Sequence, residues 1–191
     1  GCAQRSLHAA TQRRLAERAE LFVRESGGGA VLTGPWLLGV SVALPNGHPW
    51  LGDGLLESYR QLALLHAAAL AQLGIAVQVL PPPALADTNQ RLGRQLDWAC
   101  FGQLSPWELV SADGRKLVGL AQTRRRTGVL LVAGTLLAVP DWSLLCEAMG
   151  RPQDAPLLRL RCVSCAELAR RLFSPEQFAA LLTQGLVQSL A

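Results

Sequence analysis

The chain has 191 residues, half of them apolar and 17% charged, a composition that indicates one folded domain and excludes an intrinsically disordered protein. The net charge of +4 favours an acidic partner, but no basic stripe is interleaved with aromatics, so nucleic acid is not an expected partner. No membrane span or signal peptide is expected, and five cysteines without disulfide spacing indicate a cytoplasmic protein.

The first half of the chain predicts helices and short strands. Leucines spaced among Arg and Glu predict a helix over residues 6–21, and residues 54–73 predict a long helix that ends before Gly74. Strands are predicted at residues 22–26, 30–34, 37–45 and 75–80, the last stopped by three prolines.

The second half predicts a β-rich block followed by helices. Strands are predicted at residues 97–101, 107–111, 116–124 and 129–139, with tight turns at Asp113-Gly114 and Thr127-Gly128. Ser164 with Glu167 and Ser174 with Gln177 have capping-box spacing, and Pro175 suits a first helical position. This order of elements predicts an α+β domain.

Lys116 is the only lysine, whereas the other seventeen basic residues are arginine. Lysine places a compact ammonium on a flexible stem, so its use here indicates that position 116 needs lysine chemistry. The alternative is chance, because a codon bias that leaves few lysines must still place one somewhere.

Three consecutive glycines, Gly27 to Gly29, follow Arg24. Successive backbone N–H groups in such a loop can bind anionic oxygens, and Arg24 could pair with a phosphate. The spacing matches neither the Walker nor the Rossmann pattern, so a plain flexible loop remains the alternative.

Cys100 follows a small residue and precedes an aromatic one, and it is a candidate nucleophile or an ordinary packed thiol. Cys162 and Cys165 have CxxC spacing with no second pair, so no metal site is expected and structural packing is favoured. Arg124 to Arg126 are either a solvated hairpin tip or a docking patch for an acidic protein.

Four segments resemble the lipoate–protein ligase and octanoyltransferase family, the lipoyl side of the biotin/lipoyl protein ligase domain. "GCAQ" at 1–4 is similar to the end of the family's G-x-x-Q strand, and "RESGGGAVL" at 24–32 to its R-x-S-G-G-G-A-V loop. "GRKLVGLAQ" at 114–122 is similar to its lysine segment, and "GTLL" at 134–137 to the end of its H-G-[ST]-[LI] strand.

The resemblance implies a class II synthetase-like fold, a mixed β-sheet flanked by helices. Residues 1–140 would be the catalytic domain, with N-terminal strands missing, and residues 141–191 a helical extension packed on it. The implied catalytic residues are Cys100 and Lys116, on neighbouring strands. The implied acyl- or adenylate-binding residues are Arg24, Ser26, Gly27, Gly28, Gly29, Ala30, Val31, Leu32, Gly119, Gly134 and Thr135.

"ACFGQLSPWELV" at 99–110 resembles the segment before the lysine in the cysteine-dependent octanoyltransferases. The implied function is transfer of an octanoyl or lipoyl group through a thioester on Cys100, with Lys116 polarising the carbonyl. The donor would be an acyl-carrier protein, or free lipoate or octanoate. The acceptor would be a lipoyl domain such as glycine cleavage H protein or a dehydrogenase E2, and the enzyme a monomer without a further cofactor.

Two alternatives remain open at this point. An ATP-dependent lipoate ligase would use ATP and Mg, and would hold lipoyl-adenylate with Arg24, Gly29, Ala30 and Lys116. A catalytically degenerate member would only bind an acyl-carrier or lipoyl domain. The second alternative rests on Ala133, which stands where the family's H-G-[ST] histidine is expected, and on "LTG" at 32–34, where many members have His-Asp.

Overall fold

The structure, a computed structural model, describes residues 2–24, 27–52, 54, 56–169 and 173–190. A five-stranded sheet runs through it in the order β1-β5-β4-β3-β2, and all four strand pairings are antiparallel. Parallel pairing occurs in two isolated bridges, Ala30 with Ala99 and Lys116 with Cys162. The strands are β1 (Leu37–Pro45), β2 (Gln78–Val79), β3 (Leu109–Val110), β4 (Lys116–Arg125) and β5 (Gly128–Leu136).

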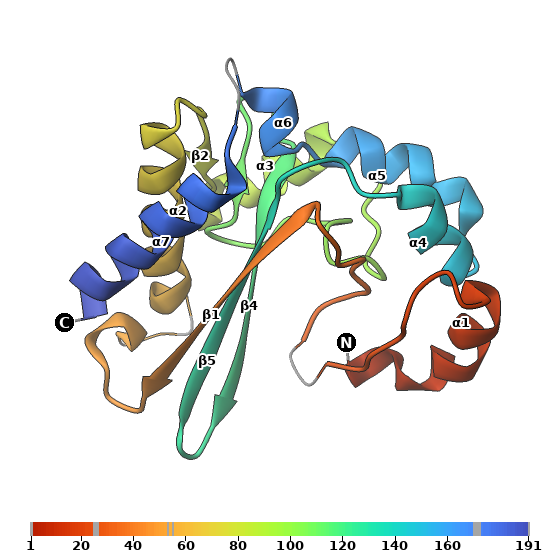
Figure 1. The fold of residues 1–191 in the computed structure, drawn as a ribbon, viewed down its shortest axis with the longest axis horizontal. Coiled ribbons are helices and arrows are strands. Elements are labelled where there is room, and N and C mark those ends of the chain that lie inside the picture. The colour runs from red at the N-terminus through yellow and green to blue at the C-terminus, as the bar shows by residue number, and fades with distance from the viewer. Residues whose placement is uncertain (1, 25–26, 53, 55, 170–172, 191) are drawn as a thin grey trace.

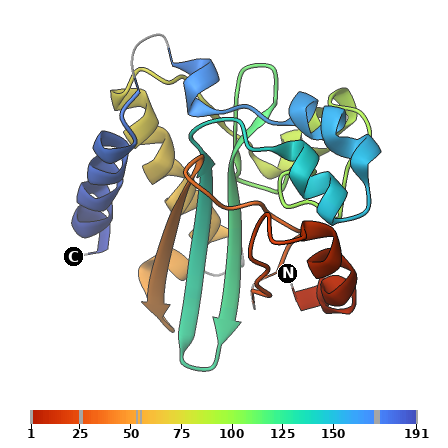
Figure 2. The same ribbon diagram turned by 45° about the vertical axis from the view of Figure 1, so that its right-hand side comes forward.

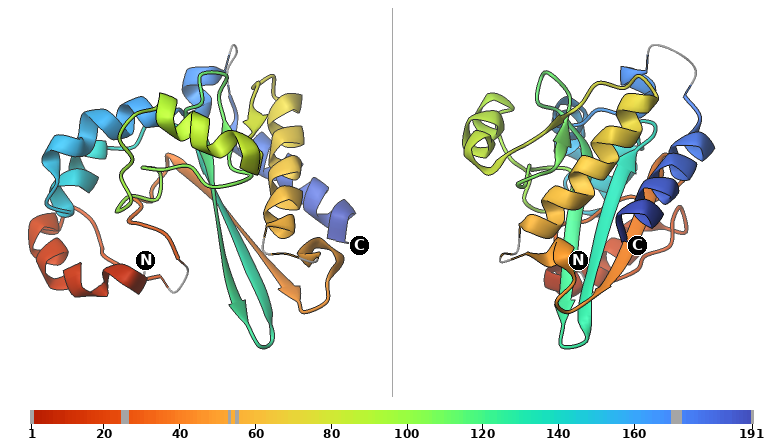
Figure 3. Two further views of the ribbon diagram at one scale, coloured as in Figure 1. Left: turned by 180° about the vertical axis from the view of Figure 1, so that it is seen from behind. Right: turned by 90° about the vertical axis from the view of Figure 1, so that its left-hand side faces the viewer.

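Helices lie on both sides of this sheet. Figures 1 and 2 show α2 and α7 on one side of the long strands, and α1, α4 and α5 on the other. The back and side views in Figure 3 give the same arrangement, which confirms the α+β class and the sheet flanked by helices. The α-helices are α1 (His8–Leu15), α2 (Glu57–Gln72), α3 (Leu85–Arg91), α4 (Trp142–Ala148), α5 (Ala155–Arg161), α6 (Cys165–Leu168) and α7 (Pro175–Leu190). The 3-10 helices are Cys2–Leu7, Pro49–Leu51, Pro82–Ala84 and Pro152–Asp154.

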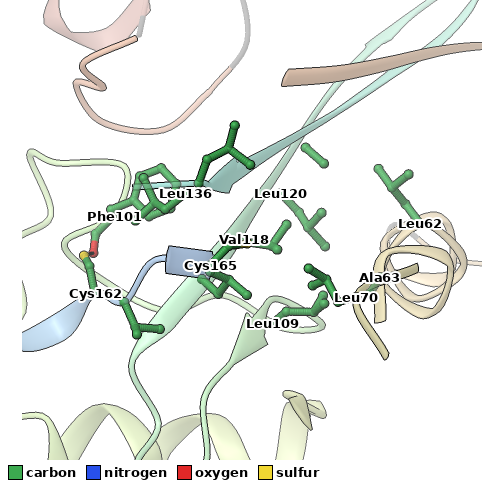
Figure 4. Packing of buried hydrophobic residues seen from close by; sticks show 14 of the residues in the cluster. Leu62, Ala63, Leu70, Phe101, Leu109, Val118, Leu120, Leu136, Cys162 and Cys165 are labelled. Carbon is green, nitrogen blue, oxygen red and sulfur yellow. Dashed lines mark hydrogen bonds between the residues drawn. The ribbon is translucent and has the colours of Figure 1, made fainter. Parts of the chain in front are cut away.

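The core follows from alternation along β1 and β5. Val42 and Leu44 are buried while Ser41 and Ala43 are exposed, because successive side chains in a strand point to opposite faces. The buried face packs against α2, and Figure 4 shows Leu62 and other α2 side chains beside residues of β3 and β4. The opposite face is partly exposed and carries Ser41 and Ala43 of β1 beside Val132 and Leu130 of β5.

Several local predictions hold. The predicted β4–β5 hairpin is present, but its two turn residues are Arg126 and Thr127, one position before the predicted Thr127-Gly128 turn, with Arg125 paired to Gly128. Ser164 and Glu167 form the complete capping box of α6. α7 begins at Pro175, as predicted, and the Ser174 Oγ accepts the Gln177 N–H at 3.1 Å.

Other local predictions are wrong. "GCAQ" lies in a 3-10 helix from residue 2 onward, not in a strand. Residues 22–24 have no regular structure, and residues 25–26 lie outside the described part of the chain. The helix predicted for 6–21 ends at Leu15, because Ala16 and Glu17 have φ of 44° and 67°, which breaks helical geometry.

The segment 97–101 is a turn, not a strand. The Ala99 N–H donates to Leu96 O at 3.1 Å, and the Gly102 N–H donates to Ala99 O at 2.9 Å. These local bonds occupy the backbone groups that a sheet ladder would use.

Among the described residues, no helix combines the length and the apolar character needed to cross a bilayer.

Candidate active site

Cys100 lies on the 97–101 turn and is half-buried. The turn is anchored from outside the sheet, since the Trp98 indole N–H donates to Asp154 Oδ2 at 3.0 Å. Asp154 is fully buried before α5 and also pairs with Arg94. The hydrogen bond from Gln4 Nε2 to Trp98 O, at 2.9 Å, adds a contact from the N-terminal 3-10 helix. The turn that carries the thiol is therefore held by distant parts of the chain.

The glycine loop packs directly on this turn. The Ala30 N–H donates to Trp98 O at 2.7 Å, and the Cys100 N–H donates to Ala30 O at 2.8 Å. Gly29 is buried, and a Cβ added there would lie 2.4 Å from Trp98 O. Glycine is required at position 29 because the two backbones approach too closely for a side chain.

Lys116 begins β4 and is only 2% exposed. Its Nζ donates to Cys100 O at 2.8 Å and to Gln103 O at 3.1 Å, and it lies 2.7 Å from Glu108 Oε1. An ammonium has three protons, so these three oxygens occupy all of them. Lys116 thus binds the backbone of the Cys100 turn. Cys100 and Lys116 were expected to be close because they would lie on neighbouring strands; they are close, but Cys100 lies on a turn and not on a strand.

The C-terminal segment also reaches this point. The Val163 N–H donates to Lys116 O at 3.0 Å, and Cys162 Sγ donates to Phe101 O at 3.3 Å, a contact shown in Figure 4. Burial raises the pKa of Cys162 and of Cys165 to about 12. Such thiols are unreactive, so the CxxC pair packs as favoured from the sequence. No cluster of three or more metal-ligating side chains occurs within the described ranges.

Glu108 was not singled out from the sequence. It is 1% exposed, and its Oε2 accepts the Ser105 N–H at 2.8 Å while its Oε1 accepts the Leu120 N–H at 3.1 Å. Burial raises the pKa of the Glu108 carboxyl, and the Lys116 ammonium opposes that rise. The sequence signal for Glu108 is that it is the only acidic residue between Asp97 and Asp113, within an apolar stretch.

Cys100, Lys116 and Glu108 line one cavity of about 290 Å³. Tyr59 from α2 and Gln122 from β4 complete its polar wall, and sequence reasoning missed both of them. Burial raises the pKa of the Tyr59 phenol, and hydrogen bonding to Gln122 opposes the rise. The other lining residues are Gly27, Gly28, Gly29, Ala99, Gln103, Ser105, Leu120 and Ala121.

The remaining expected site residues fall into two groups. Arg24, Ala30, Val31 and Leu32 line an adjacent apolar slot of about 120 Å³ between α1 and α4, and Arg24 donates to Gly29 O at 3.0 Å. Ser26 lies outside the described residues.

Gly119 and Gly134 are paired across β4 and β5, and Gly39 of β1 continues the same row. A Cβ on Gly119 would lie 3.1 Å from Lys116 Cε, so this position leaves room for the lysine. Thr135 is fully buried on the opposite face from Gly134, where its Oγ1 has no hydrogen-bond partner among the described residues. The structure therefore separates Thr135 from the glycine row.

Ala133, which replaces the expected histidine, is 1% exposed and pairs with Leu120 and Val40. A larger polar side chain would have to enter the packed face between the sheet and its helices. The packing around position 133 therefore suits alanine in place of the expected histidine.

This sheet, with a glycine loop and a buried lysine beside it, defines the class II synthetase-like ligase and transferase fold. The chain belongs to the lipoyl protein ligase A/B catalytic domain family, whose pattern matches residues 1–187. The match therefore runs through the C-terminal helices.

Curated relatives are octanoyltransferases. The chain is similar to octanoyltransferase LipM of Kyrpidia tusciae, with 32% identity over 182 residues, which cover 92% of this chain and 65% of the relative. It is 34% identical over 144 residues to octanoyltransferase LipM of Symbiobacterium thermophilum, which cover 73% of this chain and 48% of that relative. The chain thus spans between about half and two thirds of the length of these relatives.

Solved structures share the fold. A bipartite lipoate protein ligase from Thermoplasma acidophilum, studied with its E2 lipoyl domain, aligns with a TM-score of 0.65 at 15% identity over 94% of this chain and 61% of its own. Lipoate-protein ligase A bound with ATP aligns with a TM-score of 0.61 at 18% identity over 87% of this chain and 57% of its own. The biotin protein ligase of Aquifex aeolicus, with biotin and ATP, has a TM-score of 0.53 at 14% identity over 94% of this chain and 66% of its own.

Proposed function

We propose that this chain catalyses octanoyl or lipoyl transfer to a lysine of a lipoyl domain, through a thioester on Cys100. The observation that carries the proposal is the shared cavity, which brings the half-buried Cys100 thiol together with Lys116 and the glycine loop. The octanoyltransferase names of relatives at about 30% identity support the same reaction. The proposed donor is an acyl-carrier thioester. The proposed location is the reducing cytoplasm, which fits the free cysteine thiols among the described residues.

The reaction proceeds in two steps, acylation of Cys100 and then transfer of the acyl group to the acceptor lysine. The Cys100 thiolate attacks the carbonyl carbon of the donor thioester, a new S–C bond forms, and the carrier thiolate leaves and takes up the proton that Cys100 lost. The amine of the acceptor lysine then attacks the acyl-enzyme carbonyl. An amide forms, the Cys100 thiolate leaves, and the amine proton returns to it.

Lys116 supplies the positive charge beside the reacting carbonyl. Its three protons already bind Glu108, Cys100 O and Gln103 O, so an acyl oxygen has to replace one of the two backbone acceptors. A donor that strengthens as negative charge develops on the carbonyl oxygen lowers the barrier to acyl transfer. The glycine loop, with Val31 and Leu32, would line the acyl chain in the adjacent slot.

The ATP-dependent ligase is the second candidate, because solved ligases bound with ATP share the fold. In that reading Arg24, Gly29, Ala30 and Lys116 would hold the adenylate, ATP and Mg would be required, and Cys100 would only pack. The third candidate, a carrier- or lipoyl-domain binder without catalysis, rests on Ala133.

Cys100→Ser separates these candidates. The transferase predicts an octanoyl adduct by intact mass after incubation with octanoyl-carrier protein, and loss of that adduct with nearly all activity in Cys100→Ser. The ligase predicts that Cys100→Ser keeps ATP-dependent transfer of lipoate. Retained transfer from octanoyl-carrier protein in Cys100→Ser would contradict the thioester mechanism. Cys146→Ser is the matched control, since burial raises the pKa of the Cys146 thiol to about 11.

A further inference from the structure

Glu108 and Lys116 form an ion pair with both side chains only 2% exposed. An ion pair that is removed from water is retained at a desolvation cost, and it needs further hydrogen bonds to be stable. Glu108 has them, from the backbone N–H groups of Ser105 and Leu120. The carboxylate therefore occupies one fixed position between the 105–108 turn and β4.

The backbone around Glu108 is shaped to aim it inward. Trp107 has a φ of 67°, an uncommon value for a bulky residue. The Arg60 guanidinium lies 5.9 Å from the centre of the Trp107 ring, and Trp107 N–H donates to Leu80 O at 2.6 Å. These contacts hold the unusual conformation, which turns the next side chain toward Lys116.

Lys116 passes this constraint to the nucleophile. Its ammonium is fixed on one side by Glu108 and bonds on the other to the carbonyl oxygens of Cys100 and Gln103. It also lies 5.2 Å from the centre of the Phe101 ring. Cys100 and Phe101 of the turn, and Gln103 just after it, all contact this one ammonium.

We infer that Glu108 is the positioning residue of the acyl-transfer site: it holds the Lys116 ammonium on the carbonyl oxygen of Cys100 and so fixes the turn that carries the thiol. The inference rests on the proposed function. Glu108 touches neither the thiol nor any acyl group in this arrangement, and it acts through Lys116. When an acyl oxygen replaces a backbone acceptor of Lys116, Glu108 keeps the ammonium in place.

The substitutions that test this role differ in charge and in reach. Glu108→Gln keeps the size of the side chain but removes the charge, and its amide nitrogen cannot accept the Ser105 N–H. Glu108→Asp keeps the charge with one methylene less reach. Glu147→Gln makes the same chemical change in an exposed ion pair with Arg18 and is the control.

Acyl-adduct formation with octanoyl-carrier protein is measured first, with the donor varied. Glu108→Gln is expected to form the adduct at least about tenfold more slowly at saturating donor, with the KM for the donor within about twofold of wild type. Glu108→Asp should recover part of the rate, and Glu147→Gln all of it. A folded Glu108→Gln that reacts within about twofold of wild type overturns the inference, and so does an equal loss in Glu108→Asp and Glu108→Gln.

Alkylation of Cys100 by iodoacetamide, followed by peptide mass spectrometry, needs no acyl donor. Glu108→Gln should change the Cys100 rate at least about fivefold while Cys146, Cys162 and Cys165 stay protected. An unchanged Cys100 rate, or equal labelling of all four cysteines through loss of the fold, overturns the inference. If wild type forms no adduct but alkylation responds as expected, the proposed function fails and the positioning role of Glu108 stands.

Discussion

Gly29→Ala tests whether the glycine loop and the Cys100 turn form one rigid unit. The added Cβ would lie 2.4 Å from Trp98 O and 2.7 Å from the Ala99 carbonyl carbon, whereas ordinary carbon contacts are about 3.5 Å or longer. The loop and the turn must therefore separate by about 1 Å. That separation breaks the bonds that Ala30 makes to Trp98 O and from Cys100 N–H.

The expected cost follows from these contacts. Two main-chain hydrogen bonds contribute roughly 1 kcal/mol each, and forced overpacking costs about 1–3 kcal/mol. We expect the free energy of unfolding to fall by about 2–4 kcal/mol, which lowers the melting temperature by on the order of 10 °C in a domain of this size.

Gly27→Ala is the matched control, because nothing lies within 4 Å of the position that its added methyl group would take. It should leave the free energy of unfolding within about 1 kcal/mol of wild type. Thermal unfolding by circular dichroism measures both variants, and alkylation of Cys100 reports on the turn. If the two variants melt within about 2 °C of each other, the loop and the turn are not one rigid unit.

Three further predictions concern charge. Burial lowers the pKa of His66 to about 4, so the unfolded state binds more protons than the folded state between pH 6.5 and 4. The free energy of unfolding should therefore fall by roughly 3 kcal/mol as the pH drops through that window. In urea unfolding experiments, His66→Leu should flatten this fall, whereas His8→Gln on the exposed face of α1 should not. Lys116→Met leaves the buried Glu108 carboxylate unpaired and should lower the free energy of unfolding, measured with denaturant, by about 3–5 kcal/mol. Adding Glu108→Gln should recover most of this loss. If the losses of the two single variants simply add in the double variant, the pairing is refuted. The double substitution Arg125→Glu and Arg126→Glu changes the charge of the exposed hairpin tip. It should raise the KM for an acidic carrier or acceptor domain at low salt and leave kcat unchanged. An unchanged KM would mean that the tip is only solvated and does not bind the partner.

The long strands could be predicted because their signal is local. Mostly apolar runs along 37–45 and 128–136, with glycine at the hairpin, predict β1 and β5. The turn at 97–101 could not be predicted, because a short apolar run has the same composition whether it pairs in a sheet or packs under a loop. What decides its form is the contact between Ala99 and Ala30, which are 69 residues apart.

The candidate site was predicted in part for the same reason. Cys100 and Lys116 carry recognisable chemistry, and the structure brings them to one cavity. Glu108 has no periodic pattern or motif of its own, and its role depends on the left-handed backbone at Trp107. Tyr59 comes from a helix whose spacing indicates only burial, so its place opposite Gln122 required the tertiary fold.

The anchoring of the Cys100 turn has a consequence for the order in which the protein folds. The turn is joined to Gln4, to Ala30, to Lys116 and to Cys162, which are spread over most of the chain. Contacts between residues far apart in sequence form only after the entropy of closing long loops has been lost, whereas the β4–β5 hairpin closes locally. We therefore expect the Cys100 turn to form after the hairpin, so that a partly folded chain would have the β4–β5 hairpin without the assembled cavity around Cys100.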